Sequence, residues 1–295
     1  MYDIIIVGMG ISGITAAIYA KRANKKVLLL DKSMPGGLLN NIEEIGNYPG
    51  LLNISGPDFA SKLLEQVKDL DISYALEEVI EVHIDNDIKE VVTSKNTYTC
   101  QNLILAMGRK PKYLGLDNEK DYLGRGLSTC AVCDAFFYKD APIAVVGTGN
   151  SALQEALYLS KVVGKIYLLN RRDGFRGEDF LVEKVKNDPK IEIKYNVNIS
   201  SINEKDGKIS GVTLDNGEKL QVNGVFIYVG YRPDTDWLNG LDILDEEGYI
   251  RVNEAFESDI SGVFAIGDVI RKDVYQLVTA ASDGAIVINS IMKRK

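Results

Sequence analysis

Histidine and cysteine are scarce in this chain, and no long apolar run is present. The 295 residues include one histidine, His83, and three cysteines, too few for the disulfide framework of a small secreted protein. The N-terminal apolar run, residues 4–7, is far too short to cross a membrane or to form the core of a signal peptide. The sequence therefore favours the cytoplasm as the compartment.

Basic residues are also in deficit. Lysine and arginine together number 34 against 42 acidic residues, which gives a formal net charge of −8. This balance argues against a nucleic-acid partner, because no broad basic surface is available to neutralise phosphates. The chain is long enough for two domains, each with its own core.

Two of the three cysteines, Cys130 and Cys133, are separated by only two residues and are followed at once by Asp134. A pair this close can form a small disulfide ring that opens and closes reversibly. The alternative is half of a zinc site, which needs two further ligands. Cys100 and His83 are the remaining candidates, and no second Cys-x-x-Cys exists. We therefore favour a redox dithiol and expect no metal site.

A glycine-rich turn follows the first predicted strand, residues 2–7, and precedes a helix predicted over residues 14–23. A second strand, residues 26–30, ends in an acid. In this dinucleotide-binding pattern the first glycine permits the turn and the second lets a pyrophosphate approach the backbone. The third glycine lets helix and strand pack closely, and the acid meets a ribose hydroxyl. The residues concerned are Gly8, Gly10, Gly13 and Asp31.

A second turn of the same kind lies between a strand predicted over residues 142–146 and a helix predicted over residues 153–163. Here Ala152 takes the place of the third glycine, and the next strand, residues 165–169, is followed by arginines instead of an acid. Guanidinium groups in place of a carboxylate suit a ribose that carries a 2′-phosphate. The alternative is a solvated charge cluster at the end of a strand. The residues concerned are Gly147, Gly149, Asn150, Ser151, Arg171, Arg172 and Arg176.

Further apolar stretches complete the expected architecture. Short strands are predicted at residues 98–99 and 103–106, another before Asp268, and a last helix over residues 276–293. The fold class is α/β, with two Rossmann-like, three-layer nucleotide-binding domains, the second inserted into the first. We place the first domain at residues 1–115 and 243–295 and the second at residues 116–242.

Three features together resemble the low-molecular-weight, bacterial-type thioredoxin reductases, which are FAD-dependent pyridine nucleotide-disulfide oxidoreductases. Cys130-Ala131-Val132-Cys133-Asp134 lies just before the second turn, the arginines follow that turn, and Ala265-Ile266-Gly267-Asp268 begins the C-terminal return. The resemblance covers nearly the whole chain. It implies FAD in the first domain, NADPH in the second, and a homodimer.

The resemblance also implies roles for individual residues. Electrons would pass from NADPH through FAD to the Cys130–Cys133 disulfide and then to thioredoxin. Cys133 would face the flavin, Cys130 would attack the disulfide of the partner, and Asp134 would transfer protons. The residues expected to hold FAD are Gly8, Gly10, Gly13, Asp31, Gly37, Asn47, Asp268 and Gln276, and those expected to hold NADPH are the seven of the second turn and its arginines.

The chain departs from the family pattern at five positions. A glycine, a histidine, a glutamine, an arginine and a threonine are usual where this chain has Thr148, Asn170, Leu38, Tyr275 and Met107. Thr148 and Asn170 lie where NADPH would bind, and we expect the side chain of Thr148 to crowd the turn. These two departures suggest an alternative, a flavin reductase that receives electrons from ferredoxin. A reductase of another thioredoxin-like protein or of a peroxidase is a second alternative, and a zinc-holding interaction protein is a third.

Overall fold

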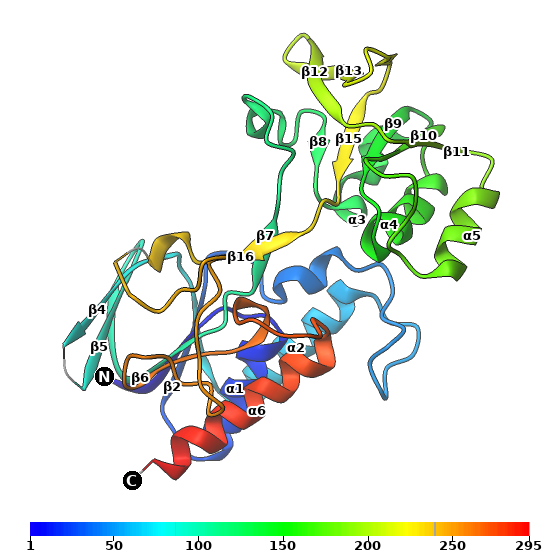
Figure 1. Cartoon of the computed structure of the whole chain (residues 1–295). Helices are drawn as coiled ribbons and strands as arrows, with labels where there is room; N and C mark the ends of the chain where they lie inside the picture. Colours follow the sequence, from blue (N-terminus) through cyan, green and yellow to red (C-terminus); the bar gives the residue numbers. More distant parts are fainter. Residues whose placement is uncertain (86, 239, 295) are drawn as a thin grey trace. The chain divides into compact units, whose positions relative to one another are not determined.

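The computed structural model describes residues 1–85, 87–238 and 240–294, which form two compact units (Figure 1). The first unit comprises Met1–Lys110 and Arg232–Lys295, and the second comprises Pro111–Tyr231. The second is therefore an insertion in the first. Both changes of unit lie earlier in the chain than the predicted boundaries after residues 115 and 242. Each change of unit falls within a short strand, the first in β7 (Arg109–Pro111) and the second in β16 (Tyr231–Pro233). These two strands pair with each other.

A seven-stranded sheet forms the centre of the first unit. Its order is β3-β2-β1-β6-β5-β4, with β17 paired to β6. The first four strands of this order and β17 pair in parallel. Strand β5 pairs antiparallel with both β6 and β4. The bounds are β1 Tyr2–Val7, β2 Val27–Asp31, β3 Ser73–Leu76, β4 Val79–Asp85, β5 Ile88–Thr93, β6 Thr97–Leu105 and β17 Val263–Ala265.

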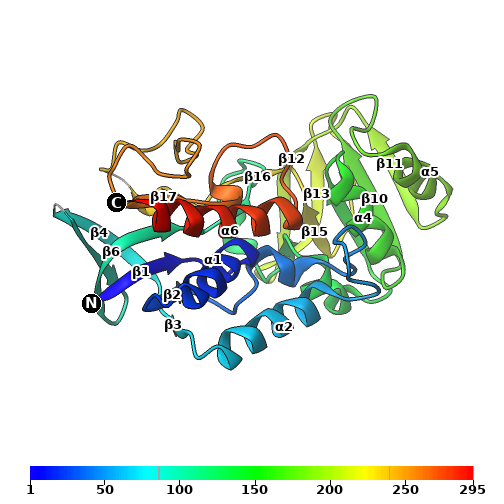
Figure 2. The same cartoon turned by 90° about the horizontal axis from the view of Figure 1, so that it is seen from below.

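Both faces of this sheet are buried, and the strand sequences show why. Alternate residues of β1 point to opposite sides, so that Ile4 and Ile6 belong to one core while Ile5 and Val7 belong to the other. Helices α1, α2 and α6 cover the first face, and α1 and α6 lie side by side (Figures 1 and 2). The second face, which includes Val82 of β4 and Val91 of β5, packs against residues of the segments 237–238 and 241–270.

The prediction of two separate strands at residues 98–99 and 103–106 was wrong, because one strand, β6 (Thr97–Leu105), runs through both segments. The structure has one strand, because the first half of β6 pairs with β5 and its second half pairs with β17 on the same side. Residues 100–102, which lie between the two predicted segments, belong to the same strand. Strand pairing from two distant parts of the chain overrides the local sequence pattern.

The second unit has a five-stranded parallel sheet in the order β11-β10-β9-β15-β8. Helices α3, α4 and α5 contribute to the core on one face, and the three-stranded antiparallel sheet β12-β13-β14 packs on the other. This is the predicted three-layer arrangement. The bounds are β8 Leu127–Ser128, β9 Pro142–Val146, β10 Lys165–Asn170, β11 Ile191–Tyr195, β12 Ile199–Lys205, β13 Lys208–Leu214, β14 Lys219–Leu220 and β15 Gly224–Ile227.

Two helices begin earlier than predicted. The helices predicted from residues 14 and 153 start at Ile11 and Asn150, so the glycine turns themselves lead into the first helical turn with Gly10 and Gly149 as N-caps. No helix in the described part of the chain is long and apolar enough to cross a bilayer. The α-helices are α1 Ile11–Arg22, α2 Gly56–Asp69, α3 Ala131–Asp134, α4 Asn150–Ser160, α5 Asp179–Asn187 and α6 Leu277–Lys293, and the 3-10 helices are η1 Gly37–Asn41, η2 Glu119–Tyr122, η3 Ala135–Tyr138, η4 Asp236–Leu238 and η5 Gly267–Val269.

Replacing Gly13 by alanine is expected to destabilise the first unit, whereas replacing Gly10 is not. A Cβ on Gly13 would lie 2.0 Å from the carbonyl oxygen of Gly8, while a Cβ on Gly10 would meet nothing within 4 Å. We expect Gly13→Ala to cost about 1–3 kcal/mol or more, because helix α1 must move away from the turn. Gly10→Ala should cost less than about 1 kcal/mol. Urea unfolding followed by circular dichroism measures both, and equal midpoints would contradict the packing argument.

Candidate functional site

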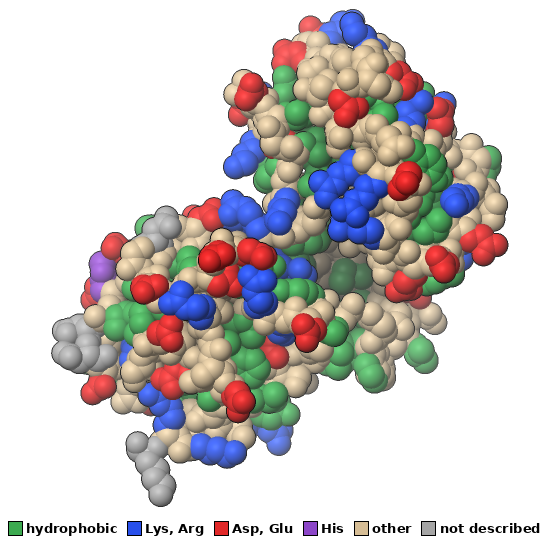
Figure 3. All heavy atoms as spheres, in the orientation of Figure 1, with side chains coloured by type: hydrophobic (Ala, Val, Ile, Leu, Met, Phe, Trp, Pro, Cys, Tyr) green, Lys and Arg blue, Asp and Glu red, His purple; other side chains and the backbone are tan. Residues whose placement is uncertain are grey.

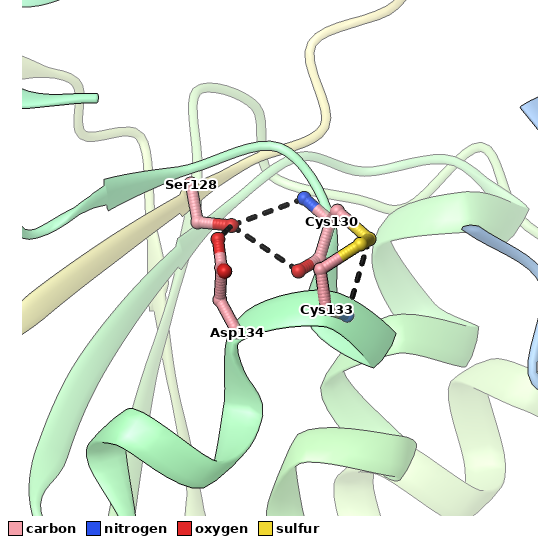
Figure 4. Close-up of a disulfide and its surroundings, with 4 residues drawn as sticks. All are labelled: Ser128, Cys130, Cys133 and Asp134. Atoms are coloured by element: carbon pink, nitrogen blue, oxygen red, sulfur yellow. Dashed lines mark hydrogen bonds between the residues drawn. A yellow bond between two sulfur atoms is a disulfide. The ribbon is translucent and has the colours of Figure 1, made fainter. Parts of the chain in front are cut away.

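Cys130 and Cys133 are joined by a disulfide at the start of the short helix α3 (Figure 4). Cys130 is half-buried, whereas Cys133 is exposed. The backbone N–H of Cys133 donates to Sγ of Cys130 at 3.2 Å. A hydrogen bond of this kind stabilises negative charge on the sulfur that accepts it. The geometry therefore favours Cys130 as the thiolate of the reduced pair.

Ser128 connects Asp134 to the dithiol (Figure 4). Its buried Oγ lies 2.6 Å from Oδ2 of Asp134 and accepts the backbone N–H of Cys130 at 3.1 Å. The carbonyl oxygen of Cys130 is a second acceptor at 3.2 Å. Because a hydroxyl has only one proton, Ser128 donates to Asp134 when the carboxylate is ionised. When Asp134 is protonated, Ser128 can accept from it and donate to Cys130 instead.

Sequence reasoning did not single out Ser128. It occupies a two-residue strand that exists only through its pairing with β15. The local sequence carries no alternation or apolar run that would predict this strand. The one available signal was a hydroxyl residue two positions before the first cysteine of the pair.

The third cysteine, Cys100, has no part in this site. It is fully buried in strand β6 of the first unit, and burial raises the pKa of its thiol to about 12. It is therefore an unreactive, protonated thiol. His83 is exposed and lies 3.5 Å from Glu81. Over residues 1–85, 87–238 and 240–294, no three His, Cys, Asp or Glu side chains gather where a metal could bind.

The turn between β1 and α1 forms a cradle in the first unit. Gly8 has φ +112°, and a Cβ there would lie 2.3 Å from the carbonyl oxygen of Ala106. The backbone N–H of Met9 donates to Oδ2 of Asp31 at 2.7 Å. The space at Gly10 is open, and the first turn of α1 contains no acidic residue. Open backbone at a helix N-terminus fits a pyrophosphate.

The loop after β2 lies against this turn. The N–H of Gly36 donates to the carbonyl oxygen of Met9 at 2.8 Å, and a Cβ on Gly37 would lie 3.9 Å from Cα of Gly10. The structure thus brings Gly37 to the turn that contains Gly8, Gly10 and Gly13, as the assignment of all four to one cofactor requires.

Residues from the end of the chain complete the site in the first unit. The side-chain amide of Asn47 donates to Oε1 of Gln276 at 2.9 Å, which joins two predicted site residues far apart in sequence. Asp268 lies in η5, after β17. The N–H of its neighbour Gly267 donates to Oδ2 of Asp283 at 2.9 Å. Burial raises the pKa of Asp283, although an ion pair with Lys272 opposes the effect.

Arg109 is a further residue of this site that the sequence did not indicate. Its Nε and Nη2 both donate to Oδ2 of Asp268, at 3.2 and 2.9 Å. Its guanidinium also lies over the ring of Tyr275, 3.9 Å from the centroid. Arg109 is the first residue of β7, and its contacts with Asp268 and Tyr275 depend on the return of the chain.

The second unit repeats the turn, with one difference. Gly147 has φ +155°, and a Cβ there would lie 2.6 Å from both Cβ of Ala152 and the carbonyl oxygen of Tyr228. Gly149 is open, and the first turn of α4 has no acid. Thr148, whose side chain was expected to crowd this turn, has a side-chain contact with the segment that follows β10. It is buried and faces Arg176, whose Nε lies 3.4 Å from its Oγ1.

Asn170 organises the loop at residues 171–177, which carries the three arginines and is called the arginine loop below. It is fully buried, its Oδ1 accepts the N–H of Arg172 at 2.8 Å, and its Nδ2 donates to the carbonyl oxygen of Gly174 at 3.1 Å. Figure 3 shows Lys and Arg side chains gathered on the second unit. The side chains that this loop leaves exposed include Arg171, Arg172 and Arg176.

The other two residues predicted to bind NADPH at this turn, Asn150 and Ser151, differ in their contacts. Asn150 is already paired, because its Oδ1 accepts the N–H of Glu178 at 2.8 Å and its Nδ2 donates to Oε1 of Glu178 at 3.0 Å. These two hydrogen bonds connect the start of α4 to the end of the arginine loop. Ser151 is exposed on the first turn of α4.

Two dinucleotide-type turns and a dithiol beside the second of them define a flavoprotein disulfide reductase. The model of the pyridine nucleotide-disulphide oxidoreductase family matches residues 2–285. The chain belongs to this family and, within it, to the bacterial-type thioredoxin reductases. It is 38% identical over 296 residues to the thioredoxin reductase of Bacillus subtilis, which covers 99% of this chain and 94% of that protein.

Solved structures agree. The chain is similar to Lactococcus lactis thioredoxin reductase in its FR conformation, with 35% identity, a TM-score of 0.94, and 99% and 98% of the two chains covered. It is also similar to a ferredoxin-flavin thioredoxin reductase from Clostridium acetobutylicum, with 30% identity, a TM-score of 0.55, and 99% and 97% covered. The predicted family and fold class are thereby confirmed.

Asp134→Asn is expected to fold and to slow dithiol turnover roughly ten- to a thousand-fold, on the scale of a lost acid–base group. The amide oxygen of asparagine can still accept from Ser128, so the local structure should persist. Pre-steady-state reduction of a small disulfide across the pH range measures the effect. Asp140→Asn, at an exposed position after η3, is the matched control. Wild-type turnover at every pH would remove Asp134 from the chemistry.

Proposed function

We propose that this chain is an NADPH-dependent thioredoxin reductase. FAD is held in the first unit, NADPH in the second, and the Cys130–Cys133 pair passes two electrons to the disulfide of thioredoxin. The observation that carries the proposal is the dithiol, placed with Ser128 and Asp134 in the unit that also has the second dinucleotide-type turn and the arginine loop. The family resemblance supports a homodimer as the working assembly.

The residues of the first unit fit FAD. Gly8, Gly10 and Gly13 give the pyrophosphate access to backbone N–H groups at the start of α1. Asp31 is held by the N–H of Met9 in a position for a ribose, and Asp268 stands at the start of the C-terminal return. Bound FAD supplies the chemistry of accepting two electrons from a nicotinamide and giving them to a disulfide.

The exchange with the partner follows from the two cysteines. The Cys130 thiolate attacks one sulfur of the partner's disulfide, and the other sulfur leaves as a thiolate. The Cys133 thiolate then attacks Sγ of Cys130, which restores the intramolecular disulfide and releases the second partner thiolate. Two electrons thus move to the partner. Asp134 donates a proton to a leaving thiolate, with Ser128 holding its carboxyl group.

The case for NADPH is strengthened by the two residues that depart from the family pattern. The side chain of Thr148 contacts the arginine loop, because its Oγ1 accepts from Nε of Arg176 at 3.4 Å. Its carbonyl oxygen also accepts the N–H groups of Arg176 and Gly177 at 2.8 and 3.2 Å, as the backbone of any residue there could. Asn170 holds the backbone of Arg172. Both residues therefore support the loop that presents guanidinium groups, and neither obstructs it. These contacts favour a 2′-phosphate ligand.

Ferredoxin is the second candidate donor. Its support is the similarity to the Clostridium acetobutylicum enzyme, whose name gives ferredoxin as its donor, at a lower TM-score than the Lactococcus lactis structure. The exposed arginines of the second unit are not required by such an enzyme. We therefore place NADPH first, and the donor experiment below separates the two.

The two cysteines are expected to give different spectra when replaced. Cys130→Ser leaves the Cys133 thiolate for the flavin and should show a long-wavelength charge-transfer band. Cys133→Ser should lack that band, because the remaining thiolate is the one that attacks the partner. Visible absorbance of the two FAD-loaded variants is the measurement. The same visible spectrum in both variants would contradict the assignment, and a band in Cys133→Ser alone would reverse it.

Arg171→Ala combined with Arg172→Ala should raise the KM for NADPH roughly 100-fold or more, because charge-assisted hydrogen bonds to a phosphate are lost. The KM for NADH should change little. Arg125→Ala, an exposed arginine outside the loop, is the control. Anaerobic flavin bleaching with NADPH, NADH and reduced ferredoxin identifies the donor. Bleaching by reduced ferredoxin alone would replace NADPH by ferredoxin.

A further inference from the structure

Arg109 makes polar and stacking contacts in the first unit that no assigned role explains. Its side chain and that of Asp268 are 17% and 20% exposed, so water screens their ion pair only in part. Nε and Nη2 of the guanidinium both donate to Oδ2 of Asp268. Among the described residues, no hydrogen bond reaches Oδ1, which leaves this oxygen for another donor.

Tyr275 provides a fixed platform for Arg109. The guanidinium lies 3.9 Å from the centroid of the ring, a distance typical of a cation–π contact. The hydroxyl of Tyr275 accepts the N–H of Lys272 at 3.3 Å, and its ring packs 6.2 Å from that of Tyr249. Arg271 covers the other end of this stack, 5.3 Å from Tyr249. The ring therefore cannot turn away without breaking contacts on two sides.

Asp268 is fixed from its backbone as well. Gly267, directly before it, donates to the buried carboxylate of Asp283, and a Cβ on Gly267 would lie 2.5 Å from Oγ of Ser12 in α1. The backbone of this turn is thus tied to the cradle, and Arg109 is the group that sets the side chain of Asp268.

We infer that Arg109 is a positioning residue of the flavin site: with Tyr275 as its platform, it orients the Asp268 carboxylate toward FAD and cancels its charge. The inference rests on the proposed function, in which Asp268 holds FAD. Reduced flavin is an anion at neutral pH, so an uncompensated carboxylate beside it would disfavour the reduced form. Arg109 removes that penalty, and it fixes the carboxylate that accepts from the cofactor.

Arg109→Ala is expected to weaken FAD binding about 10- to 100-fold, because the carboxylate loses charge-assisted hydrogen bonds that orient it. Reduced FAD should be weakened about tenfold more than oxidised FAD. For a two-electron couple this lowers the flavin midpoint potential by about 30 mV. Titration of apoprotein with FAD and anaerobic potentiometry of the loaded protein measure the two effects, and neither depends on turnover.

Three variants test the mechanism. Arg109→Lys keeps the charge but not the planar fork, so the potential should stay near that of the wild type while the FAD affinity falls. Arg109→Ala with Tyr275→Arg places a guanidinium on the other side of the contact and should recover both quantities in part. Arg271→Ala removes the arginine at the far end of the stack and should leave both unchanged. Arg109→Gln replaces Arg109→Ala if the alanine variant does not fold.

The outcomes are distinct. Wild-type apoprotein that fails to bind FAD would contradict the proposed function itself. FAD-binding wild-type protein, together with an Arg109→Ala variant of the same affinity and potential, would overturn this inference alone. An equal loss in Arg271→Ala would overturn it too, because the effect would then belong to the stack and not to the contact with Asp268.

Discussion

The close approach of a helix to the preceding strand is the constraint on which both units depend. In the first unit the approach is made by Gly13, which leaves no room for a Cβ against the carbonyl oxygen of Gly8. In the second unit Ala152 occupies that place, and Gly147 provides the missing volume by having no Cβ of its own. Two different solutions therefore give the same result, a helix N-terminus whose N–H groups are open to a phosphate.

Around the first turn, a series of carboxylates is fixed by neighbours from distant parts of the chain. Asp31 is held by the turn itself, Asp283 holds the backbone of Gly267, and Asp268 is held by Arg109. Each carboxylate accepts a hydrogen bond from a specific donor, which lowers the cost of burying its charge. The proposed cofactor site thus contains carboxylates whose orientation is set by neighbouring residues of the chain.

The dithiol shows how a few local contacts make two chemically identical residues unequal. Cys130 accepts an N–H at its sulfur and is half-buried, whereas Cys133 is exposed. Ser128 adds a hydroxyl that can follow the protonation of Asp134 by exchanging its own donor and acceptor roles. The third cysteine, Cys100, remains a buried thiol, because the cost of ionising it in an apolar core is high.

The two dinucleotide turns, the redox pair and the inserted arrangement could be predicted before the structure was known. The predictions rest on residue types at short spacing: glycines at a turn, cysteines separated by two residues and arginines at a strand end. The tertiary structure decided what depends on long-range contact. Only pairing with β5 and β17 makes β6 one strand, and only the chain's return places Arg109 on Asp268. It also decided the contacts of Thr148 and Asn170, whose residue types suggested an electron donor other than NADPH. Their hydrogen bonds show that they hold the arginine loop, and hydrogen-bond partners across a fold cannot be read from spacing along the chain.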